Sequence, residues 1–341
     1  MKVFYSETHR KHYPPFEVFD GGVRVPYLEN PDRMDQILRA LRRIDWVDIV
    51  TPMDFGLTPI LTVHDKSYLD FLASAWTEWL DSNPKDPSTL LPATFALRRT
   101  PQIPKSVLGR AGYYIMDLSA CIVEGTYEAA LASANCALGA SQDVAEQGVR
   151  SAFALCRPPG HHAGKDYAGG YCFINNASVA ANWLSSNGSV AVLDIDYHAG
   201  NGTQDIFYDR DDVLTISIHA DPDFEYPNFF GFAEERGSGR GFGFHHNFPL
   251  LQNTDDAAYM STLDRAIILI REFNPAYLVV SAGMDIYAED PLGTIKVTTN
   301  GIREIGKRIA ALDLPTVIVM EGGYANQALG RNICAFLGEL K

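Results

Sequence analysis

The sequence lacks any apolar run that approaches the ~20 residues needed to span a bilayer. Its first residues, MKVFYSETHRKHY, also lack the continuous apolar core of a secretory signal. Low-complexity tracts and internal repeats of about 20 to 50 residues are missing as well, which favours an ordinary folded globule. We therefore expect a cytoplasmic protein that has no membrane partner.

Cysteine is scarce. The chain has five cysteines, which are scattered and form no CxxC pair. An odd, scattered set is typical of reduced thiols and argues against both a disulfide framework and a thiolate zinc site. We therefore expect other side chains to be the ligands of any metal ion.

Basic residues are too few to balance the acidic ones, so the formal charge is −14. Binding of a nucleic-acid backbone needs a basic surface, and the sequence therefore excludes nucleic acid as the expected partner. Small cations are better suited to such a surface. The alternative is that the acidity only keeps the protein soluble or reflects a saline habitat.

Several short apolar segments each run directly into polar or glycine-rich residues. They are Ala152–Cys156, Val190–Asp196, Val213–Ile218, Tyr277–Ser281 and Thr316–Met320. Continuous apolar runs are typical of parallel strands that are buried on both faces, and helical stretches lie between them. We predict one α/β domain over residues 1–341, with a multi-stranded, mostly parallel sheet and helices on both faces.

The helical stretches show apolar residues at helical spacing. One begins at Asn30 with Pro31 in the first helical position, and the others are Tyr68–Leu80, Tyr127–Gln147, Asn176–Ser185, Ala257–Phe273 and Gly301–Ala311. The stretch from about residue 81 to 105 differs, because it holds five prolines and the basic pair Arg98–Arg99. It predicts a long ordered loop that is either functional or a subunit contact, with an inert insertion as the alternative.

Polar residues at the predicted strand ends carry the chemistry, because ligands of open parallel sheets bind beyond the carboxyl ends of the strands. Asp196 and His198 are two apart at one strand exit, so their side chains project to the same side, and Asp285 follows another strand. Two carboxylates and one imidazole leave coordination positions open, as in catalytic zinc sites, although iron(II) or manganese would also suit. The alternative is that Asp194, Asp196 and Asp285 merely cap loops.

Two further motifs sit at strand ends. RPPGHHA (Arg157–Ala163) holds adjacent histidines, His161 and His162, behind a rigid turn. A lone histidine is usually a packed core residue, but two side by side need partners for four ring nitrogens, which favours function. In EGGY (Glu321–Tyr324), the hydroxyl of Tyr324 can donate a hydrogen bond to a developing oxyanion.

Together these motifs resemble the metal-dependent deacetylase superfamily that has the arginase-like fold. The resemblance covers most of the chain and rests on RPPGHHA, GGYCFINN (Gly169–Asn176), LDIDYHAGNGTQ (Leu193–Gln204), SAGMD (residues 281–285) and EGGY. Within it, the segment Glu17–Gly22, the insertion TFALRRTPQIP (residues 94–104) and EGGY look like the bacterial acetylpolyamine amidohydrolases more than the eukaryotic histone deacetylases.

The resemblance implies roles for individual residues. The implied zinc ligands are Asp196, His198 and Asp285; the implied catalytic residues are His162 as general base and acid, His161 as its electrostatic partner and Tyr324 as the group that polarises the scissile carbonyl. The implied substrate-binding residues are Tyr171 and Tyr226 on the tunnel walls, with Gly170, Gly322 and Glu17. A structural K⁺ or Na⁺ would be held by Asp194 and Ser217, with backbone carbonyls of Asp196, His198 and Ile218.

The sequence departs from the family pattern at two positions. Ala199 replaces the second histidine that many relatives carry after the zinc ligand, and Asn201 replaces the aspartate that orients the second tandem histidine in histone deacetylases. The amide oxygen of Asn201 can accept a hydrogen bond from the imidazole N–H, but the amide carries no charge. We therefore expect the basicity of His162 to be lower than an aspartate would make it.

We therefore predict zinc-dependent hydrolysis of acetylated polyamines such as acetylputrescine, acetylcadaverine and acetylspermidine. Glu17 is expected at the tunnel mouth, where it would pair with the distal ammonium, and the 81–105 insertion is expected to form a homodimer contact. The alternatives are a deacetylase of lysine in proteins or peptides, a non-catalytic acetyl-amine binding module, and an arginase-like enzyme with two manganese ions, for which Ala199 and Asn201 reduce the supply of ligands.

Overall fold

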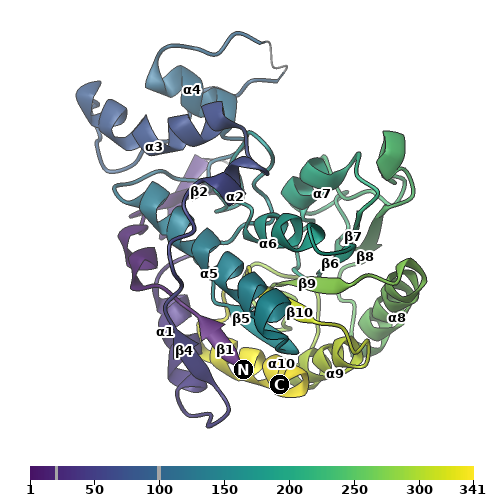
Figure 1. Ribbon diagram of the computed structural model, residues 1–341. Coiled ribbons are helices and arrows are strands. Elements are labelled where there is room, and N and C mark those ends of the chain that lie inside the picture. Colours follow the sequence, from purple (N-terminus) through teal and green to yellow (C-terminus); the bar gives the residue numbers. More distant parts are fainter. Residues whose placement is uncertain (20–21, 98–100) are drawn as a thin grey trace.

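An eight-stranded sheet forms the centre of the computed structural model, which describes residues 1–19, 22–97 and 101–341 (Figure 1). Every described strand pairing in this sheet is parallel, and the strand order is β4-β1-β5-β10-β9-β6-β7-β8. The strands are β1 (Lys2–Phe4), β4 (Asp48–Val50), β5 (Ser151–Ala154), β6 (Val190–Asp194), β7 (Val213–Ala220), β8 (His245–Leu250), β9 (Tyr277–Ala282) and β10 (Thr316–Met320). The predicted parallel α/β architecture is confirmed.

The central strands are mostly apolar because both faces of the sheet are covered. All five residues of β6 and all five of β10 are buried. Successive side chains alternate between two cores: Ala191 and Leu193 pack into one, and Val190 and Val192 into the other. The sheet therefore separates two hydrophobic layers, each closed by helices.

The helices divide between these layers (Figure 1). One layer is formed by α1 (Asp32–Leu41), α8 (Asp256–Phe273), α9 (Thr299–Ala310) and α10 (Asn326–Leu340). The other contains α2 (Thr58–Leu61), α3 (Lys66–Asp81), α4 (Val107–Tyr114), α5 (Thr126–Gln147), α6 (Asn176–Ser185) and α7 (Asn201–Phe207). No helix among the described residues is long and apolar enough to cross a bilayer.

Most predicted elements are confirmed to within one or two residues, and the differences have local causes. The strand predicted as Val190–Asp196 ends at Asp194, because the Asp194 side chain accepts a hydrogen bond of 3.0 Å from the Asp196 backbone N–H and turns the chain. Pro31 is the N-cap of α1 and precedes its first residue. Helix α10 escaped prediction, since its apolar residues are interrupted by Gly330 and Gly338.

Two short features complete the frame of the site. The strands β2 (Glu17–Phe19) and β3 (Val23–Val25) form an antiparallel hairpin, and short 3-10 helices occupy Glu7–Lys11 and Gly239–Gly241.

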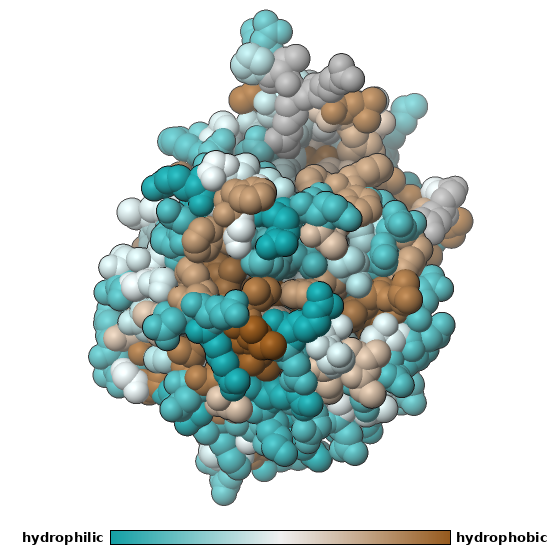
Figure 2. Space-filling model, turned by 90° about the vertical axis from the view of Figure 1, so that its right-hand side faces the viewer, coloured by the Kyte–Doolittle hydropathy of each residue, from teal (hydrophilic) through white to brown (hydrophobic). Residues whose placement is uncertain are grey.

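Between α3 and α4, the described part of the Pro-rich insertion contains no helix or strand and exposes Phe95, Leu97 and Ile103. The predicted pair Arg98–Arg99 lies outside the described residues. On the face shown in Figure 2, apolar residues gather near the middle and polar residues surround them.

Candidate active site and metal centre

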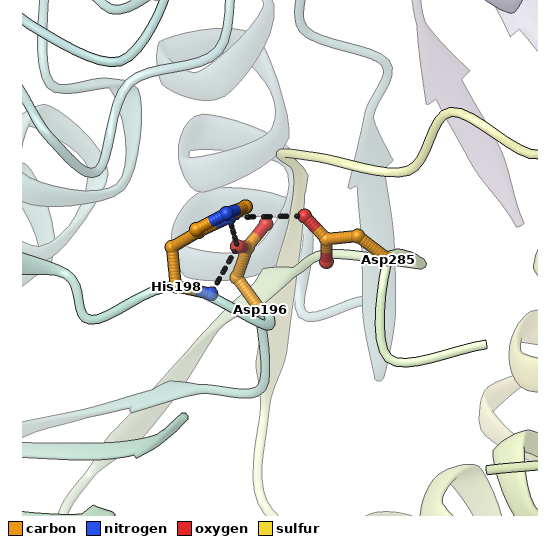
Figure 3. Close-up of side chains that lie close together, drawn as sticks. All are labelled: Asp196, His198 and Asp285. Atoms are coloured by element: carbon orange, nitrogen blue, oxygen red, sulfur yellow. Dashed lines mark hydrogen bonds and ion pairs between the residues drawn. The ribbon is translucent and has the colours of Figure 1, made fainter. Parts of the chain in front are cut away.

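Two aspartates and one histidine converge at the carboxyl ends of two adjacent strands (Figure 3). Asp196 and His198 follow β6, and Asp285 follows β9, which pairs with β6. His198 Nδ1 lies 3.4 Å from Asp196 Oδ1 and 3.4 Å from Asp285 Oδ2. One ligand atom from each residue lies within 4.8 Å of the others. Asp196 and Asp285 are 89 positions apart in the chain, and the fold brings them into one compact cluster with His198.

The cluster fits a divalent cation. Asp285 Oδ2 is buried and has no hydrogen-bond partner, whereas Asp285 Oδ1 accepts the Tyr197 N–H at 3.0 Å. Gly283 and Gly322 pack so closely that a Cβ on either would collide with the carboxylate of Asp196. The backbone therefore packs tightly around the two carboxylates. The two carboxylate oxygens and the His198 nitrogen are donors that suit Zn²⁺, Fe²⁺ or Mn²⁺.

Electrostatics of the cluster favour positive charge at its centre. Burial alone lowers the pKa of His198, but the adjacent carboxylates of Asp196 and Asp285 outweigh burial and raise the pKa to about 10. Burial, together with the nearby Asp196 carboxylate, raises the pKa of Asp285 to about 7. Two buried carboxylates this close favour a positive charge beside them.

The tandem histidines follow β5 and differ from each other in their partners. His161 Nδ1 lies 2.9 Å from Asp194 Oδ2, and His162 Nδ1 lies 2.7 Å from Asn201 Oδ1, while the ring centroids are 4.0 Å apart. Because the amide oxygen of Asn201 can only accept, His162 Nδ1 carries the proton and Nε2 keeps a lone pair. Glu321 holds the turn in place by accepting the N–H groups of Gly160 and His161.

The two imidazoles have opposite pKa shifts. Burial lowers the pKa of His161, but the carboxylates of Asp196 and Asp194 outweigh burial and hold the pKa well above its usual value. Burial, followed by the charges of His161 and His198, holds the pKa of His162 well below its usual value. His161 is therefore the cationic member and His162 the neutral member, which is the state that a proton acceptor needs.

Tyr324 follows β10 and reaches the same region. Burial raises the pKa of its hydroxyl well above 10, so the group stays protonated and can donate a hydrogen bond. The guanidinium of Arg33 lies over its ring at 4.9 Å and donates hydrogen bonds to the carbonyls of Gly323 (2.7 Å) and Glu321 (2.6 Å). Sequence reasoning assigned α1 to packing alone and missed Arg33, although an arginine within the buried stripe of a helix was a visible signal.

One cavity of about 630 Å³ joins these groups. His162, His198 and Tyr324 line it together with two aromatic walls, Tyr171 and Tyr226. The Tyr226 ring stands nearly perpendicular to the His162 ring at 4.9 Å, and the Tyr171 ring lies 5.8 Å from the Tyr324 ring. The arrangement places a neutral imidazole, a protonated tyrosine hydroxyl and a candidate metal-binding cluster around one cavity with aromatic walls.

Comparisons with known proteins agree with this arrangement. The model of the histone deacetylase domain matches residues 27–340. The chain belongs to the histone deacetylase domain family. It is 46% identical over 337 residues to acetylpolyamine amidohydrolase 1 of Pseudomonas aeruginosa, covering 97% of this chain and 96% of that protein. It is 42% identical over 340 residues to the acetylpolyamine amidohydrolase of Mycoplana ramosa, covering 99% and 98% of the two chains.

Solved structures of family members show the same fold. The crystal structure of acetylpolyamine aminohydrolase from Burkholderia pseudomallei superposes with a TM-score of 0.95 at 40% identity, covering 100% of this chain and 98% of that one. The HDA15 HD domain superposes with a TM-score of 0.82 at 27% identity, covering 100% and 90% of the two chains. The deacetylase fold is therefore shown along the whole chain.

The two predicted substrate-binding glycines of this deacetylase stand where no side chain fits. A Cβ on Gly170 would collide with the His162 ring, and its φ of +50° also favours glycine. A Cβ on Gly322 would collide with the Asp285 carboxylate, and the Gly322 N–H donates to Asp196 Oδ2 at 2.8 Å. Both glycines line the cavity, where they leave room beside His162 and the carboxylates of Asp196 and Asp285.

Asp117 also lines the cavity, and sequence reasoning missed it. Its Oδ2 accepts the Tyr226 hydroxyl at 2.7 Å and the Gly170 N–H at 2.6 Å. It thereby ties an aromatic wall to the glycine-rich segment beside His162. No motif or periodic pattern surrounds Asp117 in the sequence, so only the folded chain shows its position.

Glu17 lies elsewhere than expected. The structure buries it completely, with Oε1 accepting the Leu28 N–H at 2.8 Å and Oε2 accepting the Tyr171 hydroxyl at 2.7 Å. Its neighbours in the hairpin, Val18 and Phe19, line the cavity. The geometry therefore does not place Glu17 at the tunnel mouth beside a substrate ammonium; it makes Glu17 the anchor of the Tyr171 wall.

This placement predicts the behaviour of two Glu17 variants. In Glu17→Gln, the amide can accept from Leu28 and donate to Tyr171, so we expect KM for acetylputrescine to change less than about threefold. In Glu17→Leu, both partners lose their acceptor at a cost of about 1–3 kcal/mol, and we expect a lower Tm and similar losses for charged and neutral amides. Thermal denaturation and steady-state kinetics check this. A selective loss of charged substrate in Glu17→Gln would show direct contact instead.

The residues predicted for a monovalent cation lie at adjacent sheet positions. Asp194 on β6 pairs in register with Ser217 on β7, and Ile218 is the next residue of β7. Asp194 also bonds His161, and Ser217 Oγ lies 2.7 Å from His219 Nδ1. The strand register therefore brings Asp194, Ser217 and Ile218 together next to His161.

Proposed function

We propose that this deacetylase-family protein hydrolyses the acetyl amide of acetylated polyamines such as acetylputrescine, acetylcadaverine and acetylspermidine. The observation that carries the proposal is the Asp196, His198 and Asp285 cluster, which shares one cavity with a neutral histidine and a protonated tyrosine. The similarity to acetylpolyamine amidohydrolases over nearly the full chain supports the substrate class. Residues 1–341 would act as one deacetylase domain.

In this proposal Asp196, His198 and Asp285 hold Zn²⁺, with Fe²⁺ or another divalent ion as the alternative. A bound ion supplies Lewis acidity, which polarises an amide carbonyl and lowers the pKa of water. The same proposal assigns a structural K⁺ or Na⁺ to Asp194 and Ser217, with backbone carbonyls of Asp196, His198 and Ile218. Metal analysis of the purified protein distinguishes these ions.

The protein's own residues handle the protons. His162 Nε2 takes a proton from the attacking water and returns it to the departing amine, so that amide and water give acetate and a free amine. His161, held cationic by Asp194, stabilises negative charge in the site. The Tyr324 hydroxyl donates a hydrogen bond to the oxyanion that develops on the acetyl oxygen.

The role of Tyr324 gives a direct prediction. Tyr324→Phe keeps the ring over Arg33 but removes the donor, so we expect kcat to fall by about 10²–10³, the usual cost of one oxyanion donor. KM and Tm are expected to change little. Steady-state kinetics with acetylputrescine and a thermal melt check this, and turnover near that of the native protein would remove Tyr324 from the mechanism.

Preference for polyamines follows from the cavity and the surface. The aromatic faces of Tyr171 and Tyr226 suit a methylene chain, and Asp117 and Glu225 add carboxylates to the same cavity. The formal charge of −14 raises the local concentration of cationic substrates. A cavity with aromatic walls and acidic groups thus favours a linear, positively charged amine.

A lysine deacetylase acting on proteins or peptides is the second candidate, since it would use the same catalytic residues. An assay across acetylputrescine, acetylcadaverine, acetylspermidine and an acetyl-lysine peptide decides between them, using metal-reconstituted enzyme. We expect the highest kcat/KM with a polyamine. A higher value with the peptide would reverse the assignment, and no hydrolysis of any of the four would favour a binding module.

Assembly and location complete the proposal. We place a homodimer contact at residues 81–105, because Phe95, Leu97 and Ile103 expose apolar surface there. Sedimentation is expected to give a mass of about twice the 37.6 kDa of one chain, and a monomer would contradict the contact.

A cytoplasmic location is supported by the five cysteines, all of which carry free thiols.

A further inference from the structure

Glu225 presents a carboxylate on the cavity wall, in the loop between β7 and β8. Its Oε2 accepts the Tyr197 hydroxyl at 2.7 Å, and its Oε1 accepts the Tyr226 N–H at 3.0 Å. Tyr197 is completely buried, and its hydroxyl is also 2.9 Å from Thr294 Oγ1. The carboxylate is therefore held in one position by hydrogen bonds with buried structure, and Glu225 also lines the cavity.

Glu225 differs from Asp117 in its remaining capacity to accept hydrogen bonds. A carboxylate offers about four acceptor positions. Asp117 receives four donors: Gly170 N–H and the Tyr226 hydroxyl on Oδ2, and Ser119 N–H and Ala120 N–H on Oδ1. Among the described residues, Glu225 receives two donors, one on each oxygen. Asp196, the other carboxylate among the described lining residues, is a metal ligand in the proposed site.

The position of Glu225 relative to the reacting centre is also constrained. Tyr197, which anchors its carboxylate, directly precedes the metal ligand His198. Tyr226, the next residue, stands with its ring 4.9 Å from the His162 ring and 5.9 Å from the His198 ring. One carboxylate with two free acceptor positions thus stands beside the aromatic wall that the amine stem would pass.

We propose that Glu225 binds the distal ammonium group of the substrate, a primary or secondary alkylammonium at the far end of an acetylated linear diamine. The inference rests on the proposed polyamine function. The ammonium N–H groups would use the free acceptor position on each oxygen, while the bonds from Tyr197 and Tyr226 keep the carboxylate still. Asp117 contributes charge and shape to the cavity but has no acceptor position left to give.

The test compares two amides of equal chain length, acetylputrescine and N-butylacetamide, which lacks the ammonium. In Glu225→Gln, the amide can still satisfy Tyr197 and Tyr226, so the fold is kept while the charge is removed. We expect KM for acetylputrescine to rise roughly 10- to 100-fold, the effect of losing a charged hydrogen-bond partner, and the effect on N-butylacetamide to be at least about tenfold smaller.

Two matched variants sharpen the comparison. Glu234→Gln removes one charge from an exposed position of the same loop and controls for the overall field. Asp117→Asn tests the neighbouring carboxylate. A selective loss of acetylputrescine in Glu225→Gln, absent from Glu234→Gln, supports the proposal.

Three results would overturn the assignment of Glu225: equal losses on both amides, no loss on either, or a selective loss that appears only in Asp117→Asn. Failure of the proposed function would look different. In that case the native enzyme itself would show no preference for acetylputrescine over N-butylacetamide, whatever residue stands at position 225.

Discussion

Removing the metal ion is expected to abolish hydrolysis, with a loss of at least about 100-fold, and adding Zn²⁺, Fe²⁺ or Co²⁺ to the stripped protein is expected to restore it. The reason is the ligand cluster. Asp196 and Asp285 are completely buried, and Asp285 Oδ2 has no hydrogen-bond partner, so the two carboxylates are arranged to bind a cation. Dialysis against a chelator, followed by metal analysis and an acetylputrescine assay, measures the effect.

A ligand variant separates metal binding from other consequences of chelation. Asp285→Asn retains an oxygen for the Tyr197 N–H but loses a charged ligand, so we expect substoichiometric metal and a matching loss of activity. Asp313→Asn, at an exposed position, is the control and should bind metal normally. Full turnover in protein shown to contain no metal would exclude the proposed mechanism altogether.

Replacing His162 by alanine is expected to lower kcat by about 10²–10⁴ and to leave KM nearly unchanged. His162 is the neutral member of the tandem pair, and its Nε2 lone pair is free because Nδ1 donates to Asn201. Removing it leaves the metal ligands and the oxyanion donor in place, so substrate should still bind. Single-turnover and steady-state kinetics with acetylputrescine measure the change.

A second histidine provides the matched control. His246 on β8 is partly exposed, and its side chain bonds the Gly243 carbonyl away from the cavity residues, so His246→Ala should keep full turnover. Added imidazole should partly restore His162→Ala, because the deletion leaves a cavity that the free base can enter. Native-like turnover in His162→Ala, with its Tm unchanged, would show that another group transfers the proton.

Much of the fold could be read from local sequence. The strands β6, β9 and β10 are continuous apolar runs because both faces of a parallel sheet are covered, and their bounds agree with prediction to within two residues. The three-residue strands β1 and β4 were missed, since so few residues carry no readable pattern. Their places in the sheet depend on pairing with distant segments.

The candidate metal-binding residues could also be predicted from the sequence, for a related reason. In a parallel sheet every carboxyl end lies at the same edge, so residues that directly follow β6 and β9 must be neighbours once those strands pair. Strand ends and motif spacing were therefore sufficient to bring Asp196, His198 and Asp285 together. The neighbouring His161, His162 and Tyr324 follow β5 and β10, which lie in the same central part of the sheet.

The amino-acid sequence by itself thus determined the sheet, its reactive edge and the residues that meet there, because local apolar pattern and strand direction are properties of short segments. Only the tertiary structure decided which carboxylates face the cavity. Glu17 turned inward to bond Tyr171, whereas Asp117 and Glu225 came to the cavity wall. These side chains lie in loops and a short hairpin, where orientation depends on hydrogen bonds with residues far away in the chain, and no local pattern encodes those partners.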